Sequence, residues 1–123
     1  MILLDTNAVI WLLTAHQRAR GLEVYAGRLF LSPVSLLELR FLVEVGRLQL
    51  VPGASVADLA QDPRWLLDDP PSTALFRAAL PLAWTRDPFD RLLTAHALHR
   101  RWRLATGDRR LLAELLPGEV LAL

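Results

Sequence analysis

The chain contains no cysteine and no lysine, and it has no apolar run long enough to cross a membrane. Without cysteine, disulfide scaffolds, thiol nucleophiles and cysteine-based zinc sites are excluded. Asp5, His16 and Arg18 interrupt the first apolar stretch, which argues against both a membrane span and a signal peptide. These absences predict a cytoplasmic protein that does not associate with membranes.

The composition is that of a single folded unit. With 123 residues, 53% of them hydrophobic, the chain is long enough for one domain over residues 1–123 and too short for two. Its net charge is only +1, yet all 14 basic residues are arginine. Genomic base composition explains this most simply, although arginine also binds phosphate well. Several arginines gather in the last third, a weak indication of a nucleic-acid ligand.

Short apolar runs alternate with helical patterns along the chain. The apolar runs predict strands at residues 2–4, 29–31, 104–106 and 120–123. The periodic segments predict helices at residues 6–15, 17–25, 33–45, 72–80, 88–101 and 109–116. Strands that alternate with helices predict an α/β fold, with a mostly parallel sheet covered on both faces.

Residues 48–82 carry the weakest pattern. Ser55 and Asp58 have the spacing of a capping box for a short helix, and several prolines interrupt the residues after it. Nothing in this stretch predicts a strand or a domain boundary.

Four acidic residues come directly after the predicted strands or lie early in the next helices: Asp5, Glu38, Asp90 and Asp108. Because the strands of a parallel sheet share one direction, we expect these residues to converge at its carboxyl edge. Two carboxylates about 4 Å apart repel by roughly 4 kcal/mol at an effective dielectric near 20. Such a cluster therefore needs protons or cations to neutralise it.

Carboxylate ligands without histidine or cysteine favour Mg²⁺ or Mn²⁺, and such an ion can activate water and stabilise charge on a phosphate. The acids also have structural alternatives. Asp5 and Asp108 can cap helices, and Glu38 can be an ordinary exposed residue. Asp87 and Asp90 can form a capping arrangement, and there we assign capping to Asp87 and chemistry to Asp90.

Other polar residues near the acids have weaker signals. Thr6, Asn7 and Thr106 flank the acids and can orient a metal-bound water, with capping as the alternative for each. His96 and His99 lie farther along the Asp90 helix, so we expect solvent exposure or packing rather than metal ligation. The four tryptophans are expected in the core or at an interface.

The segments DTNAVIW, SLLELRFLVEVGRL, RDPFDRLLTAHAL and LATGDRRL together resemble the PIN-domain ribonucleases, especially the VapC-type toxins of bacterial toxin–antitoxin pairs. The resemblance implies a Rossmann-like α/β/α sandwich and an endoribonuclease that depends on Mg²⁺ or Mn²⁺. It places the catalytic and metal-binding quartet on the four acids, with Asn7, Asp87 and Thr106 in support. It also implies an RNA substrate, a homodimer, and a small cognate antitoxin that blocks the site. Many relatives have Gln where this chain has His96.

Other functions stay open at this point. A housekeeping RNA-maturation nuclease differs from a toxin by lacking a neighbouring antitoxin gene. A non-catalytic PIN-like binding module would have no need to keep four repelling acids. An aspartyl-phosphate enzyme or receiver is weaker, because position 7 is Asn and the chain has no lysine. Arg86, Arg91 and Arg109 are candidates to guide an RNA backbone.

Overall fold

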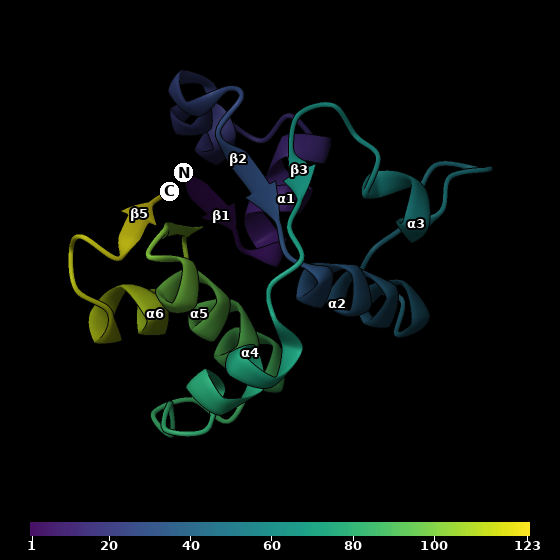
Figure 1. Ribbon diagram of the computed structural model, residues 1–123. Helices are drawn as coiled ribbons and strands as arrows, with labels where there is room; N and C mark the ends of the chain where they lie inside the picture. Colours follow the sequence, from purple (N-terminus) through teal and green to yellow (C-terminus); the bar gives the residue numbers. More distant parts are fainter.

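The computed structural model describes residues 1–123 and contains a five-stranded sheet (Figure 1). The strands are β1 (Ile2–Leu4), β2 (Leu29–Leu31), β3 (Leu66–Leu67), β4 (Arg103–Thr106) and β5 (Val120–Ala122). Their order is β3-β2-β1-β4-β5, and every neighbouring pair is parallel. The predicted parallel sheet is confirmed, with β1 at its centre.

Helices connect the strands and cover the sheet. They are α1 (Thr6–Leu13), the 3-10 helix η1 (Gln17–Tyr25), α2 (Pro33–Glu44), α3 (Val56–Leu59), α4 (Ser72–Ala79), α5 (Pro88–Arg100) and α6 (Arg109–Glu114). Each predicted helix is present, with ends that differ by at most two residues. None of the helices has the length and hydrophobicity that a membrane span requires.

Local signals in the sequence start the helices where they were expected. The hydroxyl of Ser32 accepts the Val34 N–H at 3.2 Å and caps α2, and the Asp87 carboxylate caps α5. Ser55 and Asp58 form the reciprocal hydrogen bonds of a capping box before α3. Short-range hydrogen bonds therefore define where these helices begin.

Side chains alternate across the sheet and build a core on each face. Ile2 and Leu4 of β1 pack on the side of α1 and η1, whereas Leu3 packs on the side of α5 and α6. A third apolar group, which includes Leu75 and Leu93, joins α4 and α2 to α5. The fold is thus a three-layer α/β/α sandwich, as predicted (Figure 1).

The strand β3 is the element that the sequence did not predict. It has only two residues, and both side chains are exposed, so it carries no burial pattern. Pairing alone defines it, because Leu66 and Leu67 lie beside Phe30 and Leu31 of β2. Its carboxyl end delivers Asp68 to the edge of the sheet where the other strands end.

Candidate active site

The four predicted acids lie toward the carboxyl edge of the sheet, each on a different element. Asp5 comes directly after β1, and Asp108 lies just beyond β4. Glu38 is in the second turn of α2, and Asp90 is in the first turn of α5. We call these four residues the acidic cluster.

Asp5 is the most deeply buried member of the acidic cluster, with 5% of its surface exposed. Its Oδ1 accepts the Ala8 N–H at 2.7 Å, so the capping role considered from the sequence is present. Burial raises the pKa of Asp5 to about 6, against the hydrogen bonds from Thr106 and Ala8, and the charges of Glu38 and Asp108 raise it further. Asp5 is therefore both a helix cap and an electrostatic member of the cluster.

The pKa of Asp90 is raised by burial and by neighbours in the same cluster. Its partial burial raises its pKa to about 7, and repulsion from Asp87, Asp108, Glu38 and Asp5 adds to the effect. Burial is also the main reason that the pKa of Glu38 is raised. Asp90 therefore lies within reach of the charges of the other three acids, and Asp5 lies within reach of those of Glu38 and Asp108.

The Thr106 side chain links the ends of the two central strands. Its hydroxyl accepts the Asp108 N–H at 3.0 Å and donates its hydrogen to Asp5. Asp108 in turn caps α6, since its Oδ1 accepts main-chain N–H groups at 2.8 and 3.1 Å. Thr106 thus orients two acids at once.

The remaining supporting residues have different environments. Thr6 is buried, lies 3.1 Å from the hydroxyl of Ser35, and forms a hydrogen bond that stabilises the charged form of Glu38. Asp87 is exposed and caps α5, as assigned from the sequence. Asn7 is exposed, and no hydrogen bond holds its side chain.

No arginine forms an ion pair with the acidic cluster, although the chain has 14 basic residues. The ion pairs of the structure use Glu44, Asp62 and Asp68 instead. One buried and two half-buried carboxylates with raised pKa values and no paired base, Asp5, Glu38 and Asp90, fit a hard divalent cation such as Mg²⁺ or Mn²⁺. No group of three acids or histidines is close enough to hold an ion by direct contacts alone, so an ion here would keep water among its ligands.

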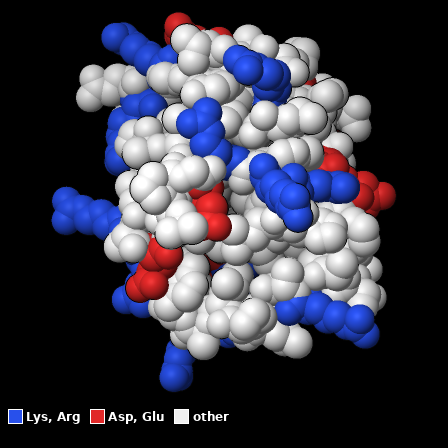
Figure 2. Space-filling view, turned by 60° about the vertical axis from the view of Figure 1, so that its left-hand side comes forward, with Lys and Arg blue, Asp and Glu red and all other residues white.

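The three arginines proposed to guide RNA differ in their surroundings. Arg86 and Arg109 are exposed, and no hydrogen bond holds either side chain. Arg91 donates to the main-chain carbonyls of Ala79 at 3.4 Å and Leu80 at 2.8 Å, which gives it a structural task at the end of α4. Figure 2 shows basic side chains projecting around acidic ones on the side of the molecule that carries β5 and α6.

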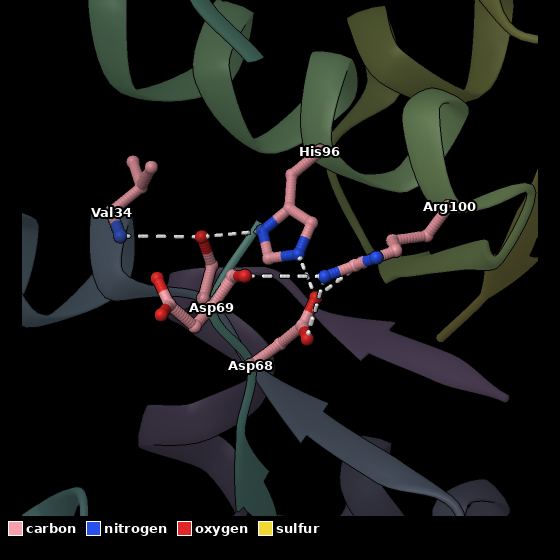
Figure 3. A network of polar contacts seen from close by, with 6 residues as sticks. Val34, Asp68, Asp69, His96 and Arg100 are labelled. Carbon is pink, nitrogen blue, oxygen red and sulfur yellow. Dashed lines mark hydrogen bonds and ion pairs between the residues drawn. The ribbon is translucent and has the colours of Figure 1, made fainter. Parts of the chain in front are cut away.

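A second polar group at the same edge was not predicted. His96 is fully buried and contacts Ser32 and Asp68, and Arg100 completes the group (Figure 3). We call these four residues the His96 network. The expectation of packing for His96 is right about burial, but its polar partners were missed. Asp68 comes after the unpredicted strand β3, in the stretch with the weakest sequence pattern.

Residues 2–115 match the family model of the PIN domain. This chain belongs to the PIN-domain family. It is 36% identical over 126 aligned residues to Ribonuclease VapC22 from Mycobacterium tuberculosis (strain ATCC 25618 / H37Rv), across 97% of this chain and 95% of that protein. The predicted family resemblance is confirmed, and it extends over nearly the whole chain.

Solved structures share the fold. A toxin–antitoxin complex from Klebsiella pneumoniae aligns with a TM-score of 0.70 at 15% identity, over 99% of this chain and 97% of that one. VapBC2 from Rickettsia felis, bound to a DNA fragment from its promoter, aligns with a TM-score of 0.66 at 19% identity, over 98% and 96%. These likenesses establish the PIN-like sandwich of the present chain.

Proposed function

We propose that this PIN domain is an endoribonuclease that depends on Mg²⁺ or Mn²⁺, and that it is the cytoplasmic toxin of a toxin–antitoxin pair. The acidic cluster carries the proposal, because its carboxylates come from four separate elements toward one edge of the sheet and have no arginine in ion-pair contact. The VapC22 relative, which matches over nearly its full length, is a ribonuclease and supports RNA as the substrate.

In this proposal Asp5, Glu38, Asp90 and Asp108 hold the ion, partly through water. When bound, the ion supplies an activated water and stabilises the charge that grows on the phosphate. The main-chain bonds to Oδ1 of Asp108 leave its Oδ2 free for a ligand. The hydroxyls of Thr6 and Thr106 hold acids of the cluster in place, and Asn7 and Asp87 remain candidates for orienting water.

Exposed arginines would hold the RNA backbone beside the acids. Arg86 and Arg109 are exposed and lie within a few residues of members of the acidic cluster. A guanidinium group pairs well with phosphate, and such contacts make binding weaker as salt increases. Arg91 stays a weaker candidate, because its donors already serve the end of α4.

We also propose two protein partners, a small antitoxin and a second copy of this chain. The similar complex from Klebsiella pneumoniae is a toxin–antitoxin complex. On the present chain, Phe76 of α4 and Leu80 just after it are 57% and 74% exposed, and Val51, which lines a groove of about 500 Å³, is 73% exposed. Large exposed apolar side chains of this kind favour protein interfaces. Light scattering tests the homodimer, and titration with the protein of an adjacent gene tests the antitoxin.

The decisive experiment is cleavage of a mixed RNA panel by the antitoxin-free protein, with Mg²⁺, Mn²⁺ or EDTA. Asp90→Asn is tested beside it, with Glu23→Gln as a matched control on an exposed acid outside the cluster. We expect cutting that needs the metal, disappears in Asp90→Asn and persists in Glu23→Gln.

Full activity of Asp90→Asn would remove the metal assignment. If the folded protein cuts nothing, calorimetry with Mn²⁺ separates a narrow RNA target from a binding module, because only the nuclease is expected to bind the ion. The absence of an adjacent antitoxin gene would favour a housekeeping nuclease instead.

A further inference from the structure

The His96 network joins three elements that are far apart in sequence. In Figure 3 the His96 side chain points from α5 toward Asp68, and Arg100 reaches the same carboxylate from one turn later. His96 Nδ1 lies 2.8 Å from the hydroxyl of Ser32, and Nε2 lies 2.7 Å from Oδ2 of Asp68. One imidazole therefore connects the start of α2, the end of β3 and the middle of α5.

The hydrogen positions are set by the chemistry of the partners. Although burial raises the pKa of Asp68, hydrogen bonds from Arg100 and His96 outweigh it and keep the carboxylate ionised. A carboxylate only accepts, so Nε2 of His96 carries the hydrogen. Burial lowers the pKa of His96 in spite of Asp68, so the ring is neutral and Nδ1 accepts from Ser32. Ser32 meanwhile accepts the Val34 N–H.

The order Ser32–His96–Asp68 resembles a nucleophilic triad, but it cannot act as one here. Ser32 and His96 both have 0% exposure, so no substrate reaches the hydroxyl. Both ring nitrogens are already engaged, which also leaves no lone pair for a metal ion. The remaining role for this group of bonds is to hold elements in place.

The elements that it holds carry two acids of the cluster. Ser32 caps α2, which bears Glu38 in its second turn. Asp90 and His96 lie six residues apart on α5, about 9 Å along its axis. Apolar contacts between α2 and α5 are non-directional, so they permit small slides of one helix along the other. Two short hydrogen bonds from a buried ring do not permit such slides.

We propose that His96 is a positioning residue whose neutral ring, held between Ser32 and Asp68, fixes α2 against α5. It thereby sets the spacing of Glu38 and Asp90 in the acidic cluster. The consequence for catalysis rests on the proposed function, whereas the placement of the two helices does not.

Two substitutions of His96 separate bridging from simple packing. His96→Gln keeps one acceptor and one donor on a neutral side chain, and His96→Leu fills the site without either. We expect His96→Leu to weaken Mn²⁺ binding in calorimetry and to lower kcat, each by about 10- to 100-fold, as outer-shell changes do. His96→Gln should stay near the wild-type value in both.

A distance measurement tests the placement without metal or RNA. The chain has no cysteine, so Arg40→Cys on α2 and His99→Cys on α5, both exposed, accept one spin label each. We expect the distance distribution between the labels to broaden or shift in His96→Leu and to stay unchanged in His96→Gln. This readout therefore decides the positioning role even if the proposed nuclease function fails.

Ser32→Gly serves as a second variant if His96→Leu does not fold, because glycine costs little at a helix N-cap and its lack of a side chain removes the hydroxyl that His96 contacts. Ser32→Gly should change the distance distribution between the two spin labels in the same way as His96→Leu does. An unchanged distribution in a folded variant without the bridge would overturn the proposal. So would equal damage by His96→Gln and His96→Leu, since only one of them loses the bridge.

Discussion

Two groups of polar residues lie beyond the carboxyl ends of the strands, and they treat charge in opposite ways. The acidic cluster takes two acids from the ends of β1 and β4 and two from the helices α2 and α5, and its carboxylates repel one another without a paired base. The His96 network joins the ends of β2 and β3 to α5, and there a carboxylate, an imidazole, a hydroxyl and a guanidinium satisfy one another.

The difference in charge pairing has opposite consequences for stability. A satisfied network contributes stability and defines geometry, because each of its hydrogen bonds and charges has a partner. An unsatisfied cluster costs stability unless something outside the chain joins it. Several arginines lie close in sequence to Asp90 and Asp108, yet no arginine pairs with an acid of the cluster. The acidic cluster thus leaves its charges unpaired, as the proposed cation site requires, whereas the His96 network pairs its own charges.

The largest expected effect comes from removing one charge of the acidic cluster. Asp5→Asn should lower RNA cleavage by more than about 100-fold, beyond the usual cost of an outer-shell change. It should also raise the melting temperature of the metal-free protein, because repulsion and the burial of charge are relieved while asparagine still caps α1. Asp62→Asn, on an acid paired with Arg64, is the control. A loss of both activity and stability in Asp5→Asn would contradict this account.

Breaking the His96 network should have the opposite effect on stability. Asp68→Ala leaves the N–H of His96 and the guanidinium of Arg100 without their acceptor, so we expect a loss of about 2–3 kcal/mol in the free energy of unfolding. Urea denaturation measures it. The neighbouring Asp69→Ala is the matched control and should change stability by less than about 0.5 kcal/mol, since only its main chain contacts Arg100. Equal losses in the two variants would show that the network adds nothing.

The two groups should also impose opposite slopes on stability as pH changes. The raised pKa values of Asp5, Glu38 and Asp90 mean that the folded, metal-free protein holds protons that unfolding releases, so stability falls as pH rises through about 4 to 7. The lowered pKa of His96 acts in reverse, and its stabilisation is present above about pH 6.5 and lost as pH falls below it.

We expect the first effect to reach about 1–2 kcal/mol between about pH 5 and pH 8, a figure already reduced for the partial exposure of Asp90. Denaturation curves at several pH values measure it. Asp90→Asn or added Mg²⁺ should flatten the alkaline limb, and His96→Gln should flatten the acid limb. A metal-free protein that becomes more stable from pH 5 to pH 8 in the His96→Gln background would refute the assignment to the acids.

The smallest expected effects come from substituting arginines. Arg86, whose side chain has no hydrogen bond, can be compared with Arg91, whose side chain is hydrogen-bonded to the main chain. Arg86→Gln should reduce the dependence of RNA binding on salt by about 0.7 in the logarithmic slope and leave stability unchanged. Arg91→Gln should instead cost about 1 kcal/mol of stability, because it removes the donors to the end of α4. Fluorescence anisotropy over a salt series and urea denaturation give the two numbers. If Arg91→Gln changed the salt dependence of RNA binding more than Arg86→Gln did, Arg91 rather than Arg86 would be the residue that contacts the RNA backbone.

Much of the fold could be predicted because its signals are local. Ser32 and Asp87 mark helix starts through bonds to residues two or three positions away, and the apolar runs at β1 and β4 mark buried strands without reference to any partner. The acids were found for the same reason. A residue just after a strand of a parallel sheet reaches the carboxyl edge whatever the other strands do.

The His96 network could not be found in this way. The strand β3 exists through pairing with β2, and its exposed side chains leave no periodic trace. Asp68 then meets His96, which is 28 positions away, and His96 meets Ser32, which is 64 positions away. The sequence alone does not distinguish a buried histidine from an exposed one. Only the packing of α5 on the sheet determines that His96 is buried.

Residue order along the chain was enough to predict the α/β alternation, the helix caps and the four acids at one edge, since each depends on short-range bonds or on strand direction. Tertiary packing then determined which acids are buried, which arginine side chains are engaged in hydrogen bonds or ion pairs, and which polar side chains contact one another. Desolvation and long-range hydrogen bonds arise only when separate elements come together. For that reason the raised pKa values of Asp5 and Asp90 and the bridge through His96 belong to the folded chain.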